Sequence, residues 1–389
     1  MEQEIGGLML LILMILAGAI AYWMQKVIFR KNYAKGVGVK IEFQTKYIEE
    51  GGSAFVTEVI ENRKYLPLPV VHVSFQTGNG IQFETMENIN VTDNTCRRDV
   101  FSLLWNQRIT RKLKFFGAKR GYYTVKTADV TVYDFLMTDK YYLELPQSTE
   151  IYVYPKQISC RRLNLLIQRI WGMMQSNEKL YEDPLRFAGI REYDITDDMK
   201  RINWKASAKG QQLMVNVYDS CVASNVYIFL DVSDKGIWKQ EELAEEGIRL
   251  TSSLYEKIVK LGSKVTVYTN GSMGKQEPQI TVSESSGGIH GVNRMLANIQ
   301  LQKSTAEVEA MFQQAQKEIK EKSGVFLLIS KNQKEGYGEL LRFYADKISG
   351  SKGKIGCMWL IPYHKNITGE ETVVPKTEGV QQILWEAEL

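Results

Sequence analysis

Residue types that perform catalysis are sparse in this sequence. The three histidines, His72, His290 and His364, are scattered along the chain, and none lies in an HExxH helix. There is no GxSxG nucleophile elbow. Gly271 to Lys275 lacks the first glycine spacing and the following Ser or Thr of a phosphate-binding loop. The sequence therefore predicts no catalytic residues and no cofactor, and we expect a protein that is not an enzyme.

The cysteines and the overall charge exclude further classes of site. Cys96, Cys160, Cys221 and Cys357 lie far apart, without CxxC or Cys/His ligand spacing, and no spacing supports a disulfide. Such sparse cysteines are typical of a reducing compartment, where thiols act as small apolar fillers. The net charge of +4 is small for 389 residues, and aromatic residues are not interleaved with a basic patch. We therefore expect no nucleic-acid partner.

The most distinctive segment runs from Glu182 to Asp219. Thr196 is suited to be a helix N-cap, and Asp197 and Asp198 would then stand in the first turn, where the positive helix end favours acids. The predicted helix continues to about Lys209 and closes at Gly210. Residues 213–218 are expected to return as an extended strand. The apolar face of this helix would consist of Met199, Ile202 and Ala206.

Two roles are open for the charged and aromatic residues of this segment. Arg191, Glu192, Asp198 and Arg201 could form a charge network that locks two domains together. Alternatively, arginine and tryptophan side chains could present a recognition surface, because both are favoured binding anchors. Mixed charges at a domain junction favour the structural role. The candidate partner-binding residues are Arg191, Glu192, Tyr193, Asp198, Arg201 and Trp204.

The elements that must position these residues begin with the uncharged segment Ile5–Gln25. A helix of roughly 20 residues spans the ~30 Å hydrocarbon layer and satisfies its own backbone hydrogen bonds there. Tyr22 and Trp23 stand where an interfacial aromatic belt would begin, and lysines and arginines follow them. The N-terminal side carries Glu2 and Glu4 and no Lys or Arg. The positive-inside rule therefore predicts a single-pass cell-membrane protein, with its N-terminus outside and its soluble body in the cytoplasm.

A cleaved signal peptide is the alternative for this segment. Ala19-Ile20-Ala21 resembles a cleavage site. However, the residues before the apolar run are acidic rather than basic, and the run is longer than a signal peptide needs. Both features favour a permanent anchor, and residues 1–30 are interpreted as a transmembrane anchor.

Residues 31–156 are expected to form an immunoglobulin-like β-sandwich. Val37, Val39 and Ile41 alternate with polar residues, as in a half-buried strand, and Gly78-Asn79-Gly80 supplies a turn. The Leu-Pro-Leu-Pro tract at 66–69 is expected to be a loop, because proline cannot donate to a strand ladder. Short strands separated by turns are typical of a sandwich. Further strand-like runs occur at 71–75, 101–104, 113–116, 122–125, 130–133 and 151–154.

Residues 157–224 connect this domain to an α/β domain at 225–389. An amphipathic helix is expected at 161–175, and its apolar stripe is interpreted as a packing surface rather than a ligand site. That stripe consists of Leu163, Leu166, Ile167, Ile170 and Met174. Strands are then predicted at 226–230, 264–268, 325–329 and 355–361, and helices at 241–260, 306–322 and 338–347. Repeated β-α units indicate a mainly parallel, doubly wound sheet.

The central segment resembles a bacterial family of unknown function, DUF 58. The pattern of that family is a Phe and a Gly, then R-E-Y, a Gly-Asp pair, Arg, Trp, S-A-R and an extended return. This chain departs from it where Thr196-Asp197 replaces Pro-Gly and Lys209 replaces Arg. The segments 120–123, 133–135 and 154–155 and the membrane leader are similar too, although two spans are more common. The matching residues are Phe187, Gly189, Arg191-Glu192-Tyr193, Asp198, Arg201, Trp204 and Ala206-Ser207-Ala208.

The resemblance implies that residues 225–389 form a von Willebrand factor A-like domain. Such domains often hold Mg²⁺ through an Asp-x-Ser-x-Ser loop with a distant Thr and Asp, which supply hard oxygen ligands. Here Asp231 and Ser233 are present, but Lys235 replaces the second Ser and Lys331 stands where the later Asp would be. Two ammonium groups would repel a divalent cation, so we expect a degenerate site without metal. A sharper hypothesis is that Lys235 or Lys331 neutralises Asp231.

The resemblance also implies a partner, a MoxR-type AAA+ ATPase for which von Willebrand-type domains act as adaptors. We therefore expect a non-catalytic, membrane-tethered binding or scaffold protein that serves such an ATPase in cell-envelope or complex-assembly processes. A cation-dependent adhesion module of von Willebrand factor A type is one alternative. An uncharacterised hydrolase with a spatially assembled site is another.

Overall fold

The computed structural model divides the chain into two compact units, Met1–Lys156 and Gln157–Leu389. Each unit has hydrophobic cores made only of its own residues. The structure describes residues 2–85, 89–91, 94–177, 182–194, 197–210, 212–220, 225–234, 240–273, 279–283, 287–333, 336–350, 355–365 and 376–387.

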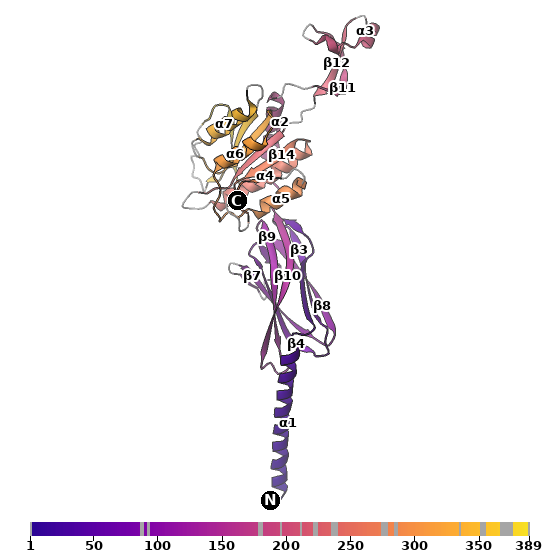
Figure 1. The fold of residues 1–389 in the computed structure, drawn as a ribbon, viewed down its shortest axis with the longest axis vertical. Coiled ribbons are helices and arrows are strands. Elements are labelled where there is room, and N and C mark those ends of the chain that lie inside the picture. The colour runs from indigo at the N-terminus through magenta and orange to yellow at the C-terminus, as the bar shows by residue number, and fades with distance from the viewer. Residues whose placement is uncertain are drawn as a thin grey trace. The chain divides into compact units, whose positions relative to one another are not determined.

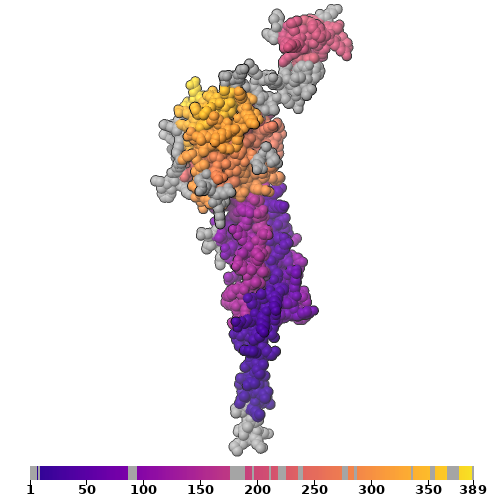
Figure 2. Space-filling view, viewed as in Figure 1, coloured from indigo at the N-terminus to yellow at the C-terminus, as the bar shows by residue number. Residues whose placement is uncertain are grey.

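The first unit begins with the long helix α1 (Glu2–Asn32). Its stretch Met9–Asn32 is long and apolar enough to cross a membrane, and none of its most apolar window is buried inside the protein. The helix stands clear of the rest of this unit for most of its length (Figure 1, Figure 2). Near its C-terminal end, Phe29 is fully buried against the β structure that follows.

After α1 in the chain, two sheets pack face to face. One has the strand order β1-β3-β8-β5 and the other β2-β10-β9-β4-β7-β6, and only β2 and β10 pair in parallel. Val56 and Phe115 of the first sheet share a core with Val73 and Val130 of the second, which makes this mostly-β region a sandwich. The strands are β1 (Val37–Phe43), β2 (Tyr47–Glu49), β3 (Ser53–Asn62), β4 (Leu68–Gly78), β5 (Ile81–Phe83), β6 (Ile89–Val91), β7 (Asn94–Leu103), β8 (Gln107–Gly117), β9 (Gly121–Tyr133) and β10 (Lys140–Tyr154).

The proline tract departs from the sequence prediction. The expected loop at 66–69 is shorter, because β4 already begins at Leu68 and includes Pro69. The register between β4 and β7 shifts between Leu68 and Val71. Proline is tolerated at the start of a strand or at such an irregularity, because no ladder hydrogen bond is then required of it.

The second unit contains a six-stranded sheet with the order β15-β14-β13-β16-β17-β18. In chain order this is 3-2-1-4-5-6, the doubly wound order, and only the pair β14–β15 is antiparallel. The predicted parallel sheet is therefore present. Its strands are β13 (Asn225–Asp231), β14 (Lys264–Thr269), β15 (Thr281–Val282), β16 (Gly324–Ser330), β17 (Ile355–Tyr363) and β18 (Val380–Glu386).

Helices cover both faces of this sheet. Ile228 and Leu230 of β13 pack into one cluster with α2, α4 and α5, whereas Tyr227 and Phe229 pack into a second cluster with α6 and α7. All five stripe residues of α2 are buried in the first cluster, which confirms the packing role predicted for them. The helices are α2 (Arg161–Asn177), α4 (Glu241–Lys260), α5 (Gly288–Asn298), α6 (Val308–Glu318) and α7 (Tyr337–Ser349).

Candidate functional site

The central segment folds into a small element of its own, which we call the motif hairpin (residues 182–220). Strands β11 (Glu182–Glu192) and β12 (Met214–Ser220) pair antiparallel as a separate two-stranded sheet. Between them lie the 3₁₀ turn η1 (Met199–Arg201) and helix α3 (Trp204–Gly210). The extended return expected after Gly210 is thereby confirmed.

Arg191 stabilises the first residues of the segment that connects β11 to β12. Its guanidinium donates two hydrogen bonds to the Asp197 carboxylate, at 2.7 and 2.5 Å, and one to the backbone carbonyl of Glu192. Asp197 also accepts the Asp194 backbone N–H. The Arg191 guanidinium therefore holds the pKa of the Asp197 carboxyl below its usual range. The sequence reading had Asp198 in this network, but Asp198 accepts the Lys200 backbone N–H and caps η1.

The predicted helix 196–209 is wrong as a single element. Its first half is η1, and the chain then leaves the helical path at Ile202, which is buried and bridges to Val215 of β12. Helix α3 starts afresh with Asn203 as N-cap, because the Asn203 side-chain oxygen accepts the Ala206 N–H at 3.0 Å. The expected N-cap, Thr196, lies outside the described residues.

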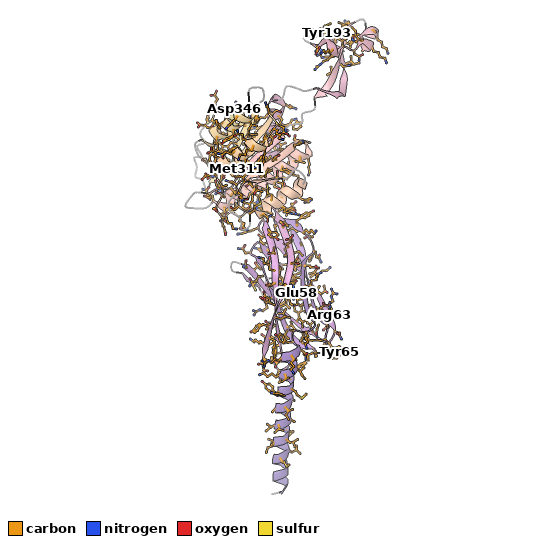
Figure 3. All side chains as sticks on the ribbon, viewed as in Figure 1. Glu58, Arg63, Tyr65, Tyr193, Met311 and Asp346 are labelled. Atoms are coloured by element: carbon orange, nitrogen blue, oxygen red, sulfur yellow. The ribbon has the colours of Figure 1, made fainter. Side chains whose placement is uncertain are left out.

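Hydrogen bonds join α3 and the connection to β12. Asn203 donates from its amide nitrogen to the Asn216 side chain at 2.7 Å and from its backbone to the Met214 carbonyl at 2.8 Å. The Ser207 hydroxyl accepts the Met214 N–H at 2.8 Å. The Tyr193 backbone N–H donates to the Leu213 carbonyl at 2.8 Å, and Figure 3 labels this residue. The motif is therefore built mainly from polar contacts within itself.

The motif hairpin also presents large apolar side chains to solvent. Trp204 is 66% exposed and Met199 is 69% exposed. Met199 was expected on the buried face of the helix, but η1 ends before that face can form. Glu192 and Arg201 are exposed as well. The hairpin thus holds its own fold with Arg191, Asp197 and Asn203 while the Trp204 side chain faces solvent.

A second polar cluster lies where the strand order of the sheet reverses. Asp231 ends β13 and Ser330 ends the adjacent β16, so both lie at the carboxyl edge where open α/β sheets bind ligands. Asp231 is buried, and its two oxygens accept four hydrogen bonds. The donors are the Asn270 side chain (2.8 Å), the Ser233 backbone (2.9 Å), the Ser330 hydroxyl (2.6 Å) and the Asn332 side chain (3.0 Å).

Lys331 lies in the same cluster but has a different partner from the one hypothesised. Its ammonium pairs with the Asp234 carboxylate and donates to the Gln240 carbonyl at 3.1 Å. Asp231 is satisfied instead by neutral hydroxyl and amide donors, so the hypothesis that Lys331 neutralises Asp231 is wrong. Lys235 lies outside the described residues.

This cluster does not fit a divalent cation. Mg²⁺ requires oxygen lone pairs directed at the ion, but N–H and O–H donors face the Asp231 carboxylate. The Asn332 amide also donates to the Ser233 hydroxyl, the other expected ligand, at 3.1 Å.

Burial and the neighbouring Asp231 carboxylate raise the pKa of the Tyr337 phenol, which therefore stays protonated.

Asn270, Ser330, Asn332 and Asp234 belong to this cluster but were not among the residues predicted from the sequence. Asn270 directly follows β14, the strand beside β13, and its side chain bridges Asp231 and the Val232 backbone. A signal was present, because the carboxyl ends of neighbouring parallel strands meet at one edge. Asp234 lies inside the same loop as Asp231 and Ser233.

The three histidines lie in separate places: His72 in β4, His290 in α5 and His364 after β17. Burial lowers the pKa of His72. Among the described residues, no group of three or more His, Cys, Asp or Glu side chains could hold a metal ion. The described cysteines, Cys96, Cys160 and Cys357, are free thiols.

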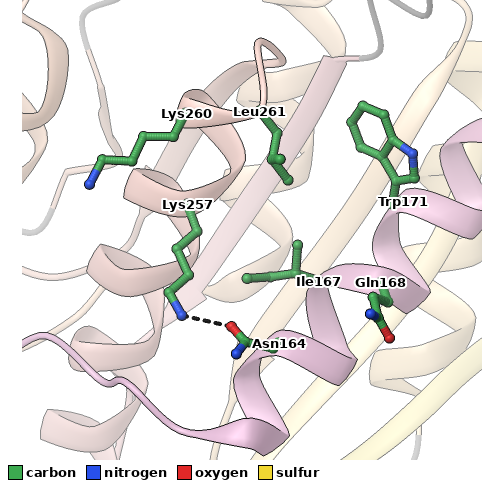
Figure 4. A pocket seen from close by; sticks show the side chains of 7 residues that line it. All are labelled: Asn164, Ile167, Gln168, Trp171, Lys257, Lys260 and Leu261. Atoms are coloured by element: carbon green, nitrogen blue, oxygen red, sulfur yellow. Dashed lines mark hydrogen bonds between the residues drawn. The ribbon is translucent and has the colours of Figure 1, made fainter.

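An apolar groove of about 520 Å³ lies between α2 and α4 (Figure 4). Ile167 and Leu261 form part of its wall, and the Lys257 ammonium crosses to the Asn164 side-chain oxygen at 2.9 Å. The groove therefore offers hydrophobic surface with ammonium groups at one side. Its lining is Asn164, Ile167, Gln168, Trp171, Lys257, Lys260 and Leu261.

Comparison with solved structures gives remote likenesses to small modules. A cohesin module from a Clostridium perfringens family 33 glycoside hydrolase is 10% identical, covering 29% of this chain and 97% of its own, with a TM-score of 0.20. The CARDB domain of a Pyrococcus furiosus protein, in complex with di-metal ions, is 14% identical, covering 31% and 90%, with a TM-score of 0.20. A non-cellulosomal cohesin from Archaeoglobus fulgidus is 13% identical, covering 33% and 96%, with a TM-score of 0.20.

Comparison with curated proteins gives no match. The model of a family described as "Protein of unknown function DUF58" matches residues 189–349. That range starts in the motif hairpin and ends with α7, so it contains Arg191, Trp204 and Asp231. Both polar clusters described above therefore lie in the part of the chain that is similar to the DUF58 family.

Proposed function

We propose that this chain is a non-catalytic binding protein tethered to the cell membrane by α1. The observation that carries the proposal is the exposure of Trp204 on a hairpin whose polar residues Arg191, Asp197 and Asn203 form hydrogen bonds within the hairpin. A buried tryptophan anchor is a common source of binding energy at protein interfaces. An exposed one, held on a stable support, is a surface that a partner protein would cover.

The partner in this proposal is a MoxR-type AAA+ ATPase, and the α/β part is a von Willebrand factor A-like adaptor domain. The 3-2-1-4-5-6 strand order and the position of Asp231 at its reversal point support that domain class. The hydrogen-bond donors around Asp231 disfavour the cation-dependent adhesion alternative. A partner would then be recognised through protein surface rather than through a shared metal ion.

The orientation in the membrane follows from charge. Lys26, Arg30 and Lys31 end α1, whereas the residues before its apolar run include Glu2 and Glu4. The positive-inside rule supports a cytoplasmic body and an external N-terminus. An AAA+ ATPase requires ATP, so a cytoplasmic body also agrees with the proposed partner.

The test is affinity purification of the crosslinked full-length protein from native membranes, with and without ATP. We expect an AAA+ ATPase to be recovered in a nucleotide-dependent manner and to be lost with Trp204→Ala. Tyr142→Ala is the matched control, because Tyr142 is also a large exposed aromatic side chain but lies on β10 of the first unit. If the Trp204→Ala protein recovered as much ATPase as the unchanged protein, Trp204 of the hairpin would not be part of the interface. Recovery of cell-wall enzymes without any ATPase would overturn the adaptor role.

A further inference from the structure

Three loops gather at the end of the sandwich from which α1 emerges (Figure 1). They are the β3–β4 loop (63–67), the β7–β8 loop (104–106) and the β9–β10 loop (134–139). The first two contact each other, because the Asn106 N–H donates to the Lys64 carbonyl at 3.2 Å. The Asn62 amide also bridges the carbonyls of Leu66 and Leu104, at 2.9 and 2.8 Å.

The β9–β10 loop is fixed directly to α1. Gln25 donates to the Asp134 carboxylate at 2.9 Å, and the Lys26 ammonium pairs with Asp139 at 3.0 Å. One turn later, the Phe29 and Phe135 rings meet edge to face with centroids 5.0 Å apart. These contacts hold the loop beside the residues at which the apolar run of α1 ends.

The β3–β4 loop is fixed to the last turn of α1. The Lys64 ammonium donates to the backbone carbonyls of Asn32 and Tyr33, at 2.7 and 2.6 Å. A cation at a helix C-terminus satisfies carbonyls that have no partner within the helix. All three loops are therefore held against the C-terminal end of α1, two directly and the β7–β8 loop through Lys64.

Apolar side chains at the tips of these loops face solvent. Tyr65 is 85% exposed, Trp105 is 61% exposed and Met137 is 61% exposed. Leu104 and Leu136 are exposed beside them. Figure 3 labels Tyr65 at this end of the sandwich. Exposed apolar groups gathered at one end of a domain indicate a contact that buries them.

The β9–β10 tip is a built structure rather than a loose turn. The Asp134 carboxylate accepts the backbone N–H groups of Thr138 and Asp139, at 2.7 and 3.2 Å, and the Thr138 hydroxyl at 2.7 Å. Met137 adopts a positive φ of 55° within this loop. The network inside the loop therefore presents Leu136 and Met137 outward, next to α1.

Exposed basic residues surround the same end. Arg30, Lys31 and Lys35 follow the apolar run, and Lys140 follows the β9–β10 loop. Asp139, which precedes Lys140 in the chain, is paired with Lys26. Apolar and aromatic tips inside a rim of lysine and arginine match the chemistry of an anionic bilayer surface, where aromatic rings lie at headgroup level and cations meet the lipid phosphates.

The register of α1 places the β9–β10 tip at that depth, because this loop contacts Gln25 and Lys26. Helix residues rise about 1.5 Å each, so the aromatic pair Tyr22-Trp23 lies within about 5 Å of Gln25 along the axis. We propose that the three loop tips insert into the headgroup layer of an anionic bilayer and form a second membrane contact beside α1. This rests on the proposed membrane span. The second contact means that the sandwich lies directly on the membrane surface and is not separated from it by a flexible linker.

The test uses full-length protein reconstituted into phosphatidylcholine/phosphatidylglycerol vesicles that carry doxyl-labelled lipids. A single environment-sensitive NBD label is attached in a cysteine-free background, at Leu136→Cys, Ile15→Cys or Lys119→Cys. Ile15 reports insertion of α1. Lys119 is the matched control, because it lies in the β8–β9 turn, at the other end of β8 from the β7–β8 loop.

We expect at least twofold quenching by shallow doxyl groups at position 136, quenching by deep doxyl groups at position 15, and none at position 119. Quenching at 15 without quenching at 136 would overturn the second contact and leave the anchor intact. Absence of quenching at 15 would overturn the membrane span itself, and the second contact with it. Equal quenching at 136 and 119 would show that the body contacts lipid without using these loops, which also overturns the inference.

Discussion

Glu58 lies inside the sandwich core, and neither of its carboxylate oxygens has a hydrogen-bond partner among the described residues. The neighbouring Asp99 forms salt bridges with Arg97, at 2.6 Å, and with Arg111, at 2.9 Å. Burial, followed by the Asp99 charge, raises the pKa of Glu58 to about 8. The folded first unit therefore keeps Glu58 protonated at neutral pH.

The pH dependence of stability follows from this shift. The folded-state pKa of about 8 lies above the ordinary value of 4.5, so the unfolded chain releases the proton at a lower pH than the folded chain. The contribution of Glu58 to stability therefore declines as the pH rises from about 4.5 to about 8. We expect Glu58→Gln to raise the melting temperature at pH 8.5 more than at pH 5, as measured by thermal denaturation in detergent. Glu49→Gln, at an exposed position of β2, is the control, and a gain independent of pH would contradict the assignment.

Asp231 is the opposite case, a buried acid that accepts four hydrogen bonds. Its removal takes away the acceptor of the buried Ser330 hydroxyl and one of the acceptors of the Asn270 and Asn332 amides. A buried group left unsatisfied costs about 1–3 kcal/mol, so we expect Asp231→Ala to lower the free energy of unfolding by about 3 kcal/mol in urea titrations. Asp346→Ala removes an exposed pair with Arg342 and should cost less than about 1 kcal/mol. Equal losses would show that the Asp231 network is not a stabilising one.

The same network predicts the response to metal. Because donors face the carboxylate, we expect calorimetric titration with Mg²⁺ or Mn²⁺ to show no saturable binding in the micromolar range. Micromolar binding that Asp231→Ala abolishes would contradict this and restore the cation-dependent alternative.

Helices and strands with a strong periodicity of apolar residues could be predicted. Elements whose bounds depend on a single contact could not. The predicted helix 241–260 coincides with α4, and the alternation predicted to be a strand from Val37 onward lies in β1, because the apolar positions repeat at 3.6 and 2 residues. Helix α5 and strand β18 were not predicted. The split between η1 and α3 was missed because it depends on Ile202 pairing with Val215, a contact that helix propensity does not contain.

The site could be predicted in part for the same reason. Arg191, Trp204 and Asp231 stand out by residue type and spacing. Their partners come from elsewhere in the fold: Asn270 follows β14, and Asn332 follows β16. Whether Lys331 would meet Asp231 or Asp234 depends on loop geometry that the order of residues leaves open.

Helix α3 offers a test at the scale of one element. Asn203 caps it and also binds Asn216, so Asn203→Ala removes both contacts. Loss of an N-cap costs about 1 kcal/mol, and we expect roughly fivefold faster amide hydrogen exchange in peptides from residues 204–210. Exchange in α4 should not change, which provides an internal control. Unchanged exchange in α3 would mean that β12 pairing alone holds the helix.

At the scale of the whole molecule, the two units have separate hydrophobic cores. We expect full-length protein in detergent to unfold in two transitions, because each core can be lost without the other. Glu58→Gln should shift only one transition and Asp231→Ala only the other, as followed by differential scanning calorimetry. A single transition shifted by both variants would show that the units unfold as one cooperative body.

The hydrogen bonds of Lys64 to the last carbonyls of α1 limit the motion of the sandwich relative to the helix. The Lys64 ammonium holds the final carbonyls of α1, and β1 begins at Val37, so no flexible linker separates helix from sandwich. A flexible tether lets a domain sweep a volume whose radius grows with about the square root of the linker length. On a helix that spans the bilayer as proposed, this joint confines the sandwich to one thin layer at the membrane. A partner confined to that layer would meet it in a two-dimensional search, with an effective concentration set by membrane area rather than by cell volume.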